Sequence, residues 1–265
     1  MVNRPPDNPR SASGYGPDGG SERTAVLTAP HEFWTPVGEV RGPLEEAEAH
    51  VLAARSQAMI ADPRPLGLGA FAATTWVIST VIAGWESMAA LAVVIPIALF
   101  FGGGAQFLAG MWAFRRGNTL AATAFSSFGA FNVAFGAWLL LTAAHLLPVS
   151  QGNGQSAAVV AGWFIITFGV VAGYLALASL AESGVLFLIL ATLTVTYVLD
   201  GIGVMIGGNN WVAYIGGYFG LLSALIAFYL SAAIVINASF GREIFPMFEV
   251  GAPPRAATHP VARRP

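Results

Sequence analysis

Asp200 is the one clear carboxylate inside a long apolar stretch of this chain, and two threonines precede it at helical spacing. Thr192 and Thr196 stand two turns and one turn earlier, so an α-helix would align the three side chains as a polar stripe. A carboxylate in a hydrocarbon layer is costly, and where one occurs it commonly relays protons or coordinates an ion. Asp200 is therefore a candidate proton-linked group. The alternative is a carboxylate close enough to the surface to be hydrated.

Three phenyl rings and one amide form a second candidate constellation. At 100° per residue, a helix places Phe125, Phe128, Asn132 and Phe135 within a sector of roughly 80°. Rings at these positions would strip water from a small carboxylate while Asn132 donates a hydrogen bond to it. An aromatic packing face with one interhelical amide bond explains the pattern equally well.

Two further groups of polar residues interrupt apolar stretches. Phe71, Thr74 and Thr75 share one helical face, and Gln106 stands among glycines at positions 102, 103, 104 and 110. Such glycines let helices approach closely or expose backbone dipoles, and close packing is the commoner reason. The run is not a phosphate loop, because it lacks the Lys and Ser/Thr that end such a loop.

The elements that must position these residues are membrane helices. The chain has 265 residues, is 55% hydrophobic and only 10% charged, and has a mean hydropathy of +0.66. A water-soluble globule of this composition would expose too much apolar surface. Crossing a hydrocarbon core takes about 20 apolar residues per helix, and continuous apolar runs favour helices over a barrel. We predict an all-α protein with six spans, near residues 66–84, 88–114, 121–144, 157–180, 184–206 and 210–238.

All basic residues apart from histidine are arginines, and they flank one side of these spans. Six precede the first span, Arg115 and Arg116 join the second to the third, and four follow the last. Because basic residues are retained on the cytoplasmic side, both termini are predicted to be cytoplasmic. The chain has no Cys, which excludes disulfides, thiolate metal sites and cysteine catalysis.

The segments outside the spans differ in composition. Residues 1–43 are rich in Pro, Gly and Ser and predict a disordered cytoplasmic tail. Residues 44–61 carry apolar side chains at three- and four-residue spacing, which favours an amphipathic juxtamembrane helix over a solvated linker helix. The six-helix transmembrane domain is assigned to 62–241, and residues 242–265 read as a cytoplasmic C-terminal tail of disordered composition.

The string DPRPLGL opens the first span. Pro63 and Pro65 suit a first helical turn, where a missing backbone donor costs nothing, and Asp62 can cap exposed N–H groups. On these grounds alone, an ordinary helix start is the simplest interpretation.

The longer string DPRPLGLGAFAATTW resembles the NPAPLGL signature and following helix of the acetate uptake transporter family, which includes the succinate-acetate permeases. Two more stretches resemble that family: FFGGGAQFLAGMWAFRRGNTLAATAFSSFGAF, and GLLSALIAFYLSAAIVINASFGREIFP at the end of the sixth span. The resemblance implies a six-helix protomer, usually a homo-hexamer, that moves acetate and related small carboxylates with protons. The signature positions here are Asp62, Pro63, Pro65, Leu66, Gly67 and Leu68.

Matching by motif position also implies a constriction that tunes substrate size, lined here by Phe71, Phe128, Phe131, Leu193 and Ala227. Two positions depart from the family. Its leading Asn is Asp62 here, which introduces a negative charge near the inner mouth, so we expect slower or pH-dependent anion passage. The Tyr of its narrow passage matches Phe128, which keeps the ring but loses the hydroxyl and leaves substrate preference open.

Together these observations predict a proton-linked acetate transporter in a plasma membrane, with succinate or other short carboxylates as further substrates. Polar candidates in the substrate pathway are Thr74, Thr75, Gln106 and Asn132. No basic side chain falls inside the predicted spans, so polar groups, helix dipoles and a co-transported proton must offset the substrate charge.

Two alternatives remain at this stage. One is a channel-like pore for small monocarboxylates or the neutral acid, and the other is a non-transporting membrane sensor or assembly protein. The sequence shows no metal-ligand spacing, hydrolase elbow or polybasic stripe. It therefore predicts neither an enzyme nor a metal, cofactor or nucleic-acid site.

Overall fold

The structure is a computed structural model that describes residues 47–48, 51–52, 60–146 and 154–250, with only the backbone described at 154–156. Residues 47–48 and 51–52 are helical, but most of the amphipathic helix predicted at 44–61 lies outside the described residues. The tail predicted at 1–43 and residues 251–265 also lie outside them.

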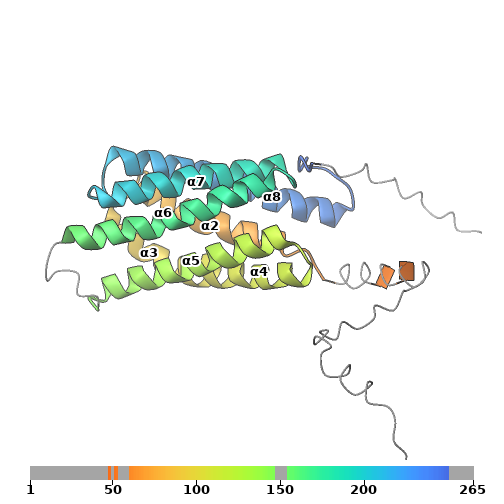
Figure 1. Ribbon diagram of the computed structural model, residues 1–265, viewed down its shortest axis with the longest axis horizontal. Helices are drawn as coiled ribbons and strands as arrows, with labels where there is room; N and C mark the ends of the chain where they lie inside the picture. Colours follow the sequence, from red (N-terminus) through yellow and green to blue (C-terminus); the bar gives the residue numbers. More distant parts are fainter. Residues whose placement is uncertain (1–46, 49–50, 53–59, 147–153, 251–265) are drawn as a thin grey trace, which may run out of the picture. The chain divides into compact units, whose positions relative to one another are not determined.

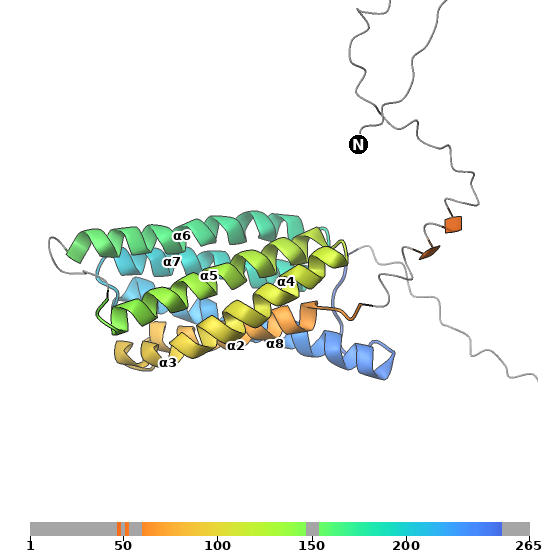
Figure 2. The same cartoon turned by 90° about the horizontal axis from the view of Figure 1, so that it is seen from below.

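Within residues 60–250, six helical segments are long and apolar enough to cross a membrane, which confirms the six-helix prediction. They run back and forth along one axis (Figures 1 and 2). Their bounds are α2 (Arg64–Ile82), the composite segment Met88–Arg115, α5 (Thr119–Ala143), α6 (Gly154–Ser179), α7 (Gly184–Met205) and α8 (Trp211–Phe240).

The second span is not one continuous α-helix. It consists of the 3-10 turn η1 (Met88–Ala90), α3 (Leu91–Pro96), the π-helix η2 (Ile97–Ala105) and α4 (Gln106–Arg115). Pro96 removes a backbone donor, and the glycines at 102–104 add conformational freedom, so the wider winding is accommodated here. Because a π turn takes more residues than an α turn, η2 sets the register of α4, in which Gln106 is buried.

Glycines let this second span lie close against α2 and α5. An added Cβ at Gly102 would collide with Thr74 of α2, and one at Gly110 would collide with Ser126 of α5. In the reverse direction, a Cβ at Gly129 of α5 would lie 2.7 Å from the backbone nitrogen of Phe107. Close helix packing, the commoner of the two sequence interpretations, therefore accounts for these glycines.

One phenyl ring ties α6 to its neighbours. The ring of Phe131 on α5 lies 5.2 Å from that of Phe164 and 4.6 Å from that of Phe168, both on α6. It also meets Tyr197 of α7 edge-on at 5.1 Å. Such offset and edge-to-face pairs stabilise helix contacts beyond simple area burial.

The two ends of the helical domain differ in charge. Residues 60–63 and the segment after α8 lie at the same end as the α4–α5 and α6–α7 turns, which we call the tail end (Figure 1). Among the described residues, every arginine belongs to this end: Arg64, Arg115, Arg116 and Arg242. The opposite end, called the far end, holds the α2–η1 and α7–α8 turns.

Glu86 and Glu243 are exposed at opposite ends, which allows the orientation to be tested. A membrane-impermeant thiol reagent should label Glu86→Cys in intact cells and Glu243→Cys only after permeabilisation, because arginine-rich ends are generally retained in the cytoplasm and we predict the same orientation here. The natural chain has no Cys, so each variant carries a single thiol. The opposite labelling pattern would reverse the orientation.

Candidate functional site

Two cavities lie among α2, α5, α7 and α8 at different depths. The tail-side cavity has a volume of about 360 Å³, and its lining includes Arg64 and Glu249. The far-side cavity has a volume of about 140 Å³, and its lining includes Asn132 and Asp200. The bundle is thus hollow on both sides of its middle.

Between the cavities lies one layer of apolar side chains. Going from the tail end, α2, α5 and α7 each contribute a residue to the tail-side cavity, then one to the layer, then one to the far-side cavity. These residues are Leu68, Phe71 and Thr75 on α2, Phe125, Phe128 and Asn132 on α5, and Leu190, Leu193 and Tyr197 on α7, with Leu193 also bordering the far-side cavity.

The apolar layer, made of Phe71, Phe128 and Leu193, is closely packed. Its side chains are 4%, 2% and 1% exposed. The rings of Phe71 and Phe128 lie 6.4 Å apart, and the ring of Phe128 lies 6.1 Å from that of Tyr197. A solute passing between the cavities must therefore displace or rotate these side chains.

The structure buries all five motif-matched constriction residues. Three of them form the apolar layer, Phe131 lines the far-side cavity, and Ala227 is fully buried on α8. Their roles in substrate passage stay predictions.

The amide of Asn132 is bonded within the protein. Its Nδ2 donates to Oε1 of Gln106 at 3.3 Å and to the backbone oxygen of Phe128 at 3.0 Å. This is the interhelical amide bond given above as the alternative interpretation. A bound carboxylate would have to replace one of these bonds, although Asn132 does line the far-side cavity.

The two threonines of α2 have different surroundings. Thr74 is fully buried against Gly102, and its Oγ1 has no hydrogen-bond partner among the described residues. Thr75 is half-buried and lines the far-side cavity. Of the pair, Thr75 is therefore the one placed to meet a solute.

Asp200 is buried in protein beside the far-side cavity, and not at a hydrated surface. It is 6% exposed, and its Oδ1 has no hydrogen-bond partner within the described part of the chain. It packs against Gly216 of α8, where an added Cβ would collide with Oδ1. The threonine hydroxyls do not reach it, because Thr196 donates to the backbone oxygen of Thr192 at 3.0 Å and Thr192 donates to that of Leu188 at 2.7 Å.

Arg64 is the main lining residue that the sequence interpretation passed over. The expectation that no basic group falls inside the spans was wrong, because α2 begins at Arg64, two residues before the predicted start. Its side chain lines the tail-side cavity. The available signal was an arginine between two prolines that fix the first helical turn.

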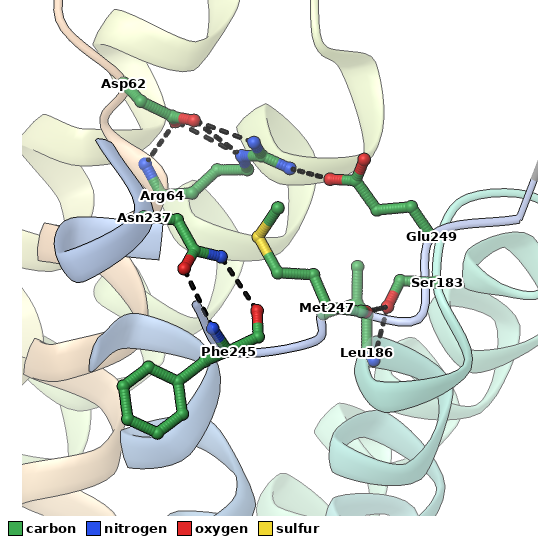
Figure 3. A network of polar contacts seen from close by, with 8 residues as sticks. All are labelled: Asp62, Arg64, Ser183, Leu186, Asn237, Phe245, Met247 and Glu249. Carbon is green, nitrogen blue, oxygen red and sulfur yellow. Dashed lines mark hydrogen bonds and ion pairs between the residues drawn. The ribbon is translucent and has the colours of Figure 1, made fainter. Parts of the chain in front are cut away.

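Figure 3 shows the polar contacts that hold the Arg64 side chain. Its Nη2 lies 2.8 Å from Asp62 Oδ2, and its backbone nitrogen donates to Asp62 Oδ1 at 2.9 Å. Its Nη1 lies 3.8 Å from Glu249 Oε1. Burial raises the pKa of Asp62, but the hydrogen bonds and positive charge of Arg64 outweigh it and bring that pKa below its ordinary value of 3.8.

Comparison with known proteins identifies the family of this chain. Residues 45–249 match the sequence pattern of the GPR1/FUN34/yaaH family. This chain belongs to that family. It is 33% identical over 190 residues to the succinate-acetate/proton symporter SatP of Escherichia coli (strain K12), covering 72% of this chain and 96% of the relative. It is 34% identical over 200 residues to acetate permease A of Emericella nidulans, covering 71% of this chain and 65% of the relative.

A solved bacterial membrane protein has the same fold. The structure of the bacterial acetate channel SatP matches with a TM-score of 0.63 and 30% sequence identity, over 71% of this chain and 98% of that chain. The family resemblance and the six-helix membrane fold predicted from the sequence are thereby confirmed. These relatives are named as transporters and a channel, in line with the expected non-enzymatic role.

Within the family signature, Asp62 and Arg64 stand where NPAPLGL has Asn and Ala, and the two new charges pair with each other. The negative charge expected at the mouth is therefore neutralised locally. Because the pKa of Asp62 is lowered on folding, its ionised form stabilises the folded state above the ordinary value of 3.8, and this contribution is lost as pH falls through the lower folded value.

We predict that Asp62→Asn lowers the free energy of unfolding by about 0.2–1 kcal/mol, equally from about pH 5 to 8, since the pair is partly exposed. The difference from the natural chain should shrink below about pH 4. Thermal unfolding in detergent measures it, with Glu243→Gln as a control for an exposed charge. A difference that changes between pH 5 and 8 would mean that Asp62 titrates near neutrality.

Proposed function

We propose that this chain transports acetate, with succinate and other short carboxylates as further substrates, across a plasma membrane together with protons. The observation that carries the proposal is the pair of cavities on opposite sides of one apolar layer. The similarity to the succinate-acetate/proton symporter SatP and to acetate permease A supports the choice of substrate.

The apolar layer supplies the physical argument for protons. Phe71, Phe128 and Leu193 offer no charge or side-chain donor to an ionised carboxylate, and moving an unpaired ion into such surroundings costs far more than moving a neutral acid. A carboxylate that crosses with a proton avoids that cost. Arg64 on the tail side and Asp200 on the far side then serve as the groups that meet the ion and the proton outside the layer.

Phe128→Ala tests the apolar layer. Removing this ring widens the passage without adding a donor, so the preference for acetate over bulkier monocarboxylates should fall by about tenfold or more. Uptake of a labelled series of increasing size into proteoliposomes measures this preference, after equal assembly is confirmed. Phe100→Ala is the matched control, because Phe100 is 78% exposed. If Phe128→Ala keeps the substrate preference of the natural chain, the Phe128 ring serves only in packing and does not select substrates.

Asp200→Asn tests proton coupling. With one proton per acetate, a gradient of about one pH unit sustains about tenfold accumulation, because both correspond to about 1.4 kcal/mol. The variant should bring the accumulation ratio toward one while acetate exchange without a pH gradient continues. Asn has nearly the same shape and should fit beside Gly216. An unchanged accumulation ratio would mean that Asp200 does not carry the proton and that the proton crosses on acetate itself.

A channel-like pore for small monocarboxylates or the neutral acid is the second candidate, supported by the similarity to the bacterial acetate channel SatP. Flux of the ionised form through such a pore would follow the acetate gradient, and a pH gradient would not drive accumulation. The same proteoliposomes therefore separate symport from a pore for the ionised form. A pore for the neutral acid would accumulate acetate under a pH gradient as symport does, and Asp200→Asn would leave its accumulation ratio unchanged. No uptake under either gradient would favour a non-transporting sensor.

We further propose cytoplasmic termini and a homo-hexamer. The arginines at the tail end support the orientation. The lipid-side surface of α4 offers large apolar side chains for bilayer or neighbouring protomers to cover: Phe107, Leu108, Met111, Trp112 and Phe114. The mass of the detergent-solubilised complex tests assembly, with about six times 27.6 kDa expected.

A further inference from the structure

The chain turns back after α8 and lines one side of the tail-side cavity. Gly241 ends α8 in a left-handed conformation with φ of 64°. Asn237 then fixes the returning chain, because its Oδ1 accepts from the backbone nitrogens of Ile244 at 2.7 Å and Phe245 at 3.0 Å, and its Nδ2 donates to the Phe245 oxygen at 2.8 Å. We call residues 244–250 the strap.

The other end of the strap is tied to the turn between α6 and α7. Ser183 Oγ donates to the backbone oxygen of Met247 at 3.0 Å, and the backbone nitrogen of Val250 donates to the Glu182 oxygen at 2.9 Å. Ser183 and Glu249 form an antiparallel bridge. Because Met247, Glu249 and Val250 all line the tail-side cavity, the strap forms part of its wall (Figure 3).

Glu249 connects the strap to Arg64. The ion pair is long, at 3.8 Å, and its side chains are 35% exposed for Arg64 and 38% for Glu249. The pair of Arg64 with Asp62, at 2.8 Å, is closer. A substrate carboxylate has the charge and the oxygen geometry of the Glu249 side chain. It can therefore replace Glu249 on Arg64 while Asp62 keeps the guanidinium in place.

Phe248 shows independently that the closed strap is strained. Its φ is 49°, a left-handed conformation that bulky residues rarely adopt. The ring is 63% exposed, so packing of the side chain does not hold this conformation. Hydrogen bonds of the neighbouring backbone hold it, including the bond from the Gly184 nitrogen to the Phe248 oxygen at 3.3 Å. Opening the strap would release this strain.

From these contacts we propose that the strap gates the tail-side cavity and that Arg64 is the carboxylate-binding group behind it. Opening separates Glu249 from Arg64, and the substrate carboxylate takes its place. The inference rests on the proposed transport of carboxylates. It adds a gate that the apolar layer does not require, and it says how Arg64 becomes free to bind, by exchanging Glu249 for the substrate carboxylate.

A disulfide lock tests the gate. Bridge partners have Cα atoms about 4.5–5.5 Å apart, which a disulfide can span, and the chain has no Cys of its own. Oxidised Ser183→Cys/Glu249→Cys should lose acetate flux by about tenfold or more and regain it on reduction. In each single variant the oxidant should change nothing. If the oxidised double variant transports acetate as fast as the reduced double variant, the strap is not a gate. If the natural chain itself shows no acetate flux, the proposed transport function is wrong instead.

A second measurement does not depend on transport. In detergent, acetate should speed thiol labelling of Met247→Cys by about two- to fivefold relative to chloride, and Arg64→Gln should abolish that effect. Glu249→Gln should speed labelling without acetate by a similar factor, whereas the exposed Glu243→Gln outside the strap should not. Labelling that is insensitive to acetate and to Glu249→Gln would exclude Arg64 and Glu249 as the latch.

Discussion

An apolar layer of Phe71, Phe128 and Leu193 closes the middle of the bundle. This closure decides where the charged groups of the pathway must lie. A layer without polar groups cannot solvate an ion, so charge must be received and released on either side of it. The residues are distributed accordingly, with Arg64 beside the tail-side cavity and Asp200 beside the far-side cavity. Neither charged group lies at the level of the layer itself.

The helices were predictable because apolar runs of membrane length have few alternative structures in lipid. The internal winding of the second span was not. Pro96 and the following glycines signal irregularity, but the choice of a π-helix depends on how closely α2 and α5 approach. A shift of two residues at the start of α2 also decided whether Arg64 counted as a loop residue or as part of the pathway.

Helical faces were more predictable than the partners of the side chains on them. Phe128 and Asn132 are buried on one face of α5, as their spacing indicates. The bond from Asn132 to Gln106 joins residues far apart in the chain, and only helix packing brings them together. Residues 244–250 read as part of a tail because backbone bonds to Asn237 and Ser183 hold them, and such bonds leave no apolar periodicity in the sequence.

The contact between Asp200 and Gly216 has an evolutionary consequence. The carboxylate occupies the volume that any larger residue at 216 would fill, so the two positions share one space across α7 and α8. A side chain at 216 would force the Asp200 carboxylate to move, so a substitution at either position changes what the other position tolerates. The two sites should therefore vary together among relatives, with a glycine at 216 wherever an acidic residue at 200 has this side-chain position.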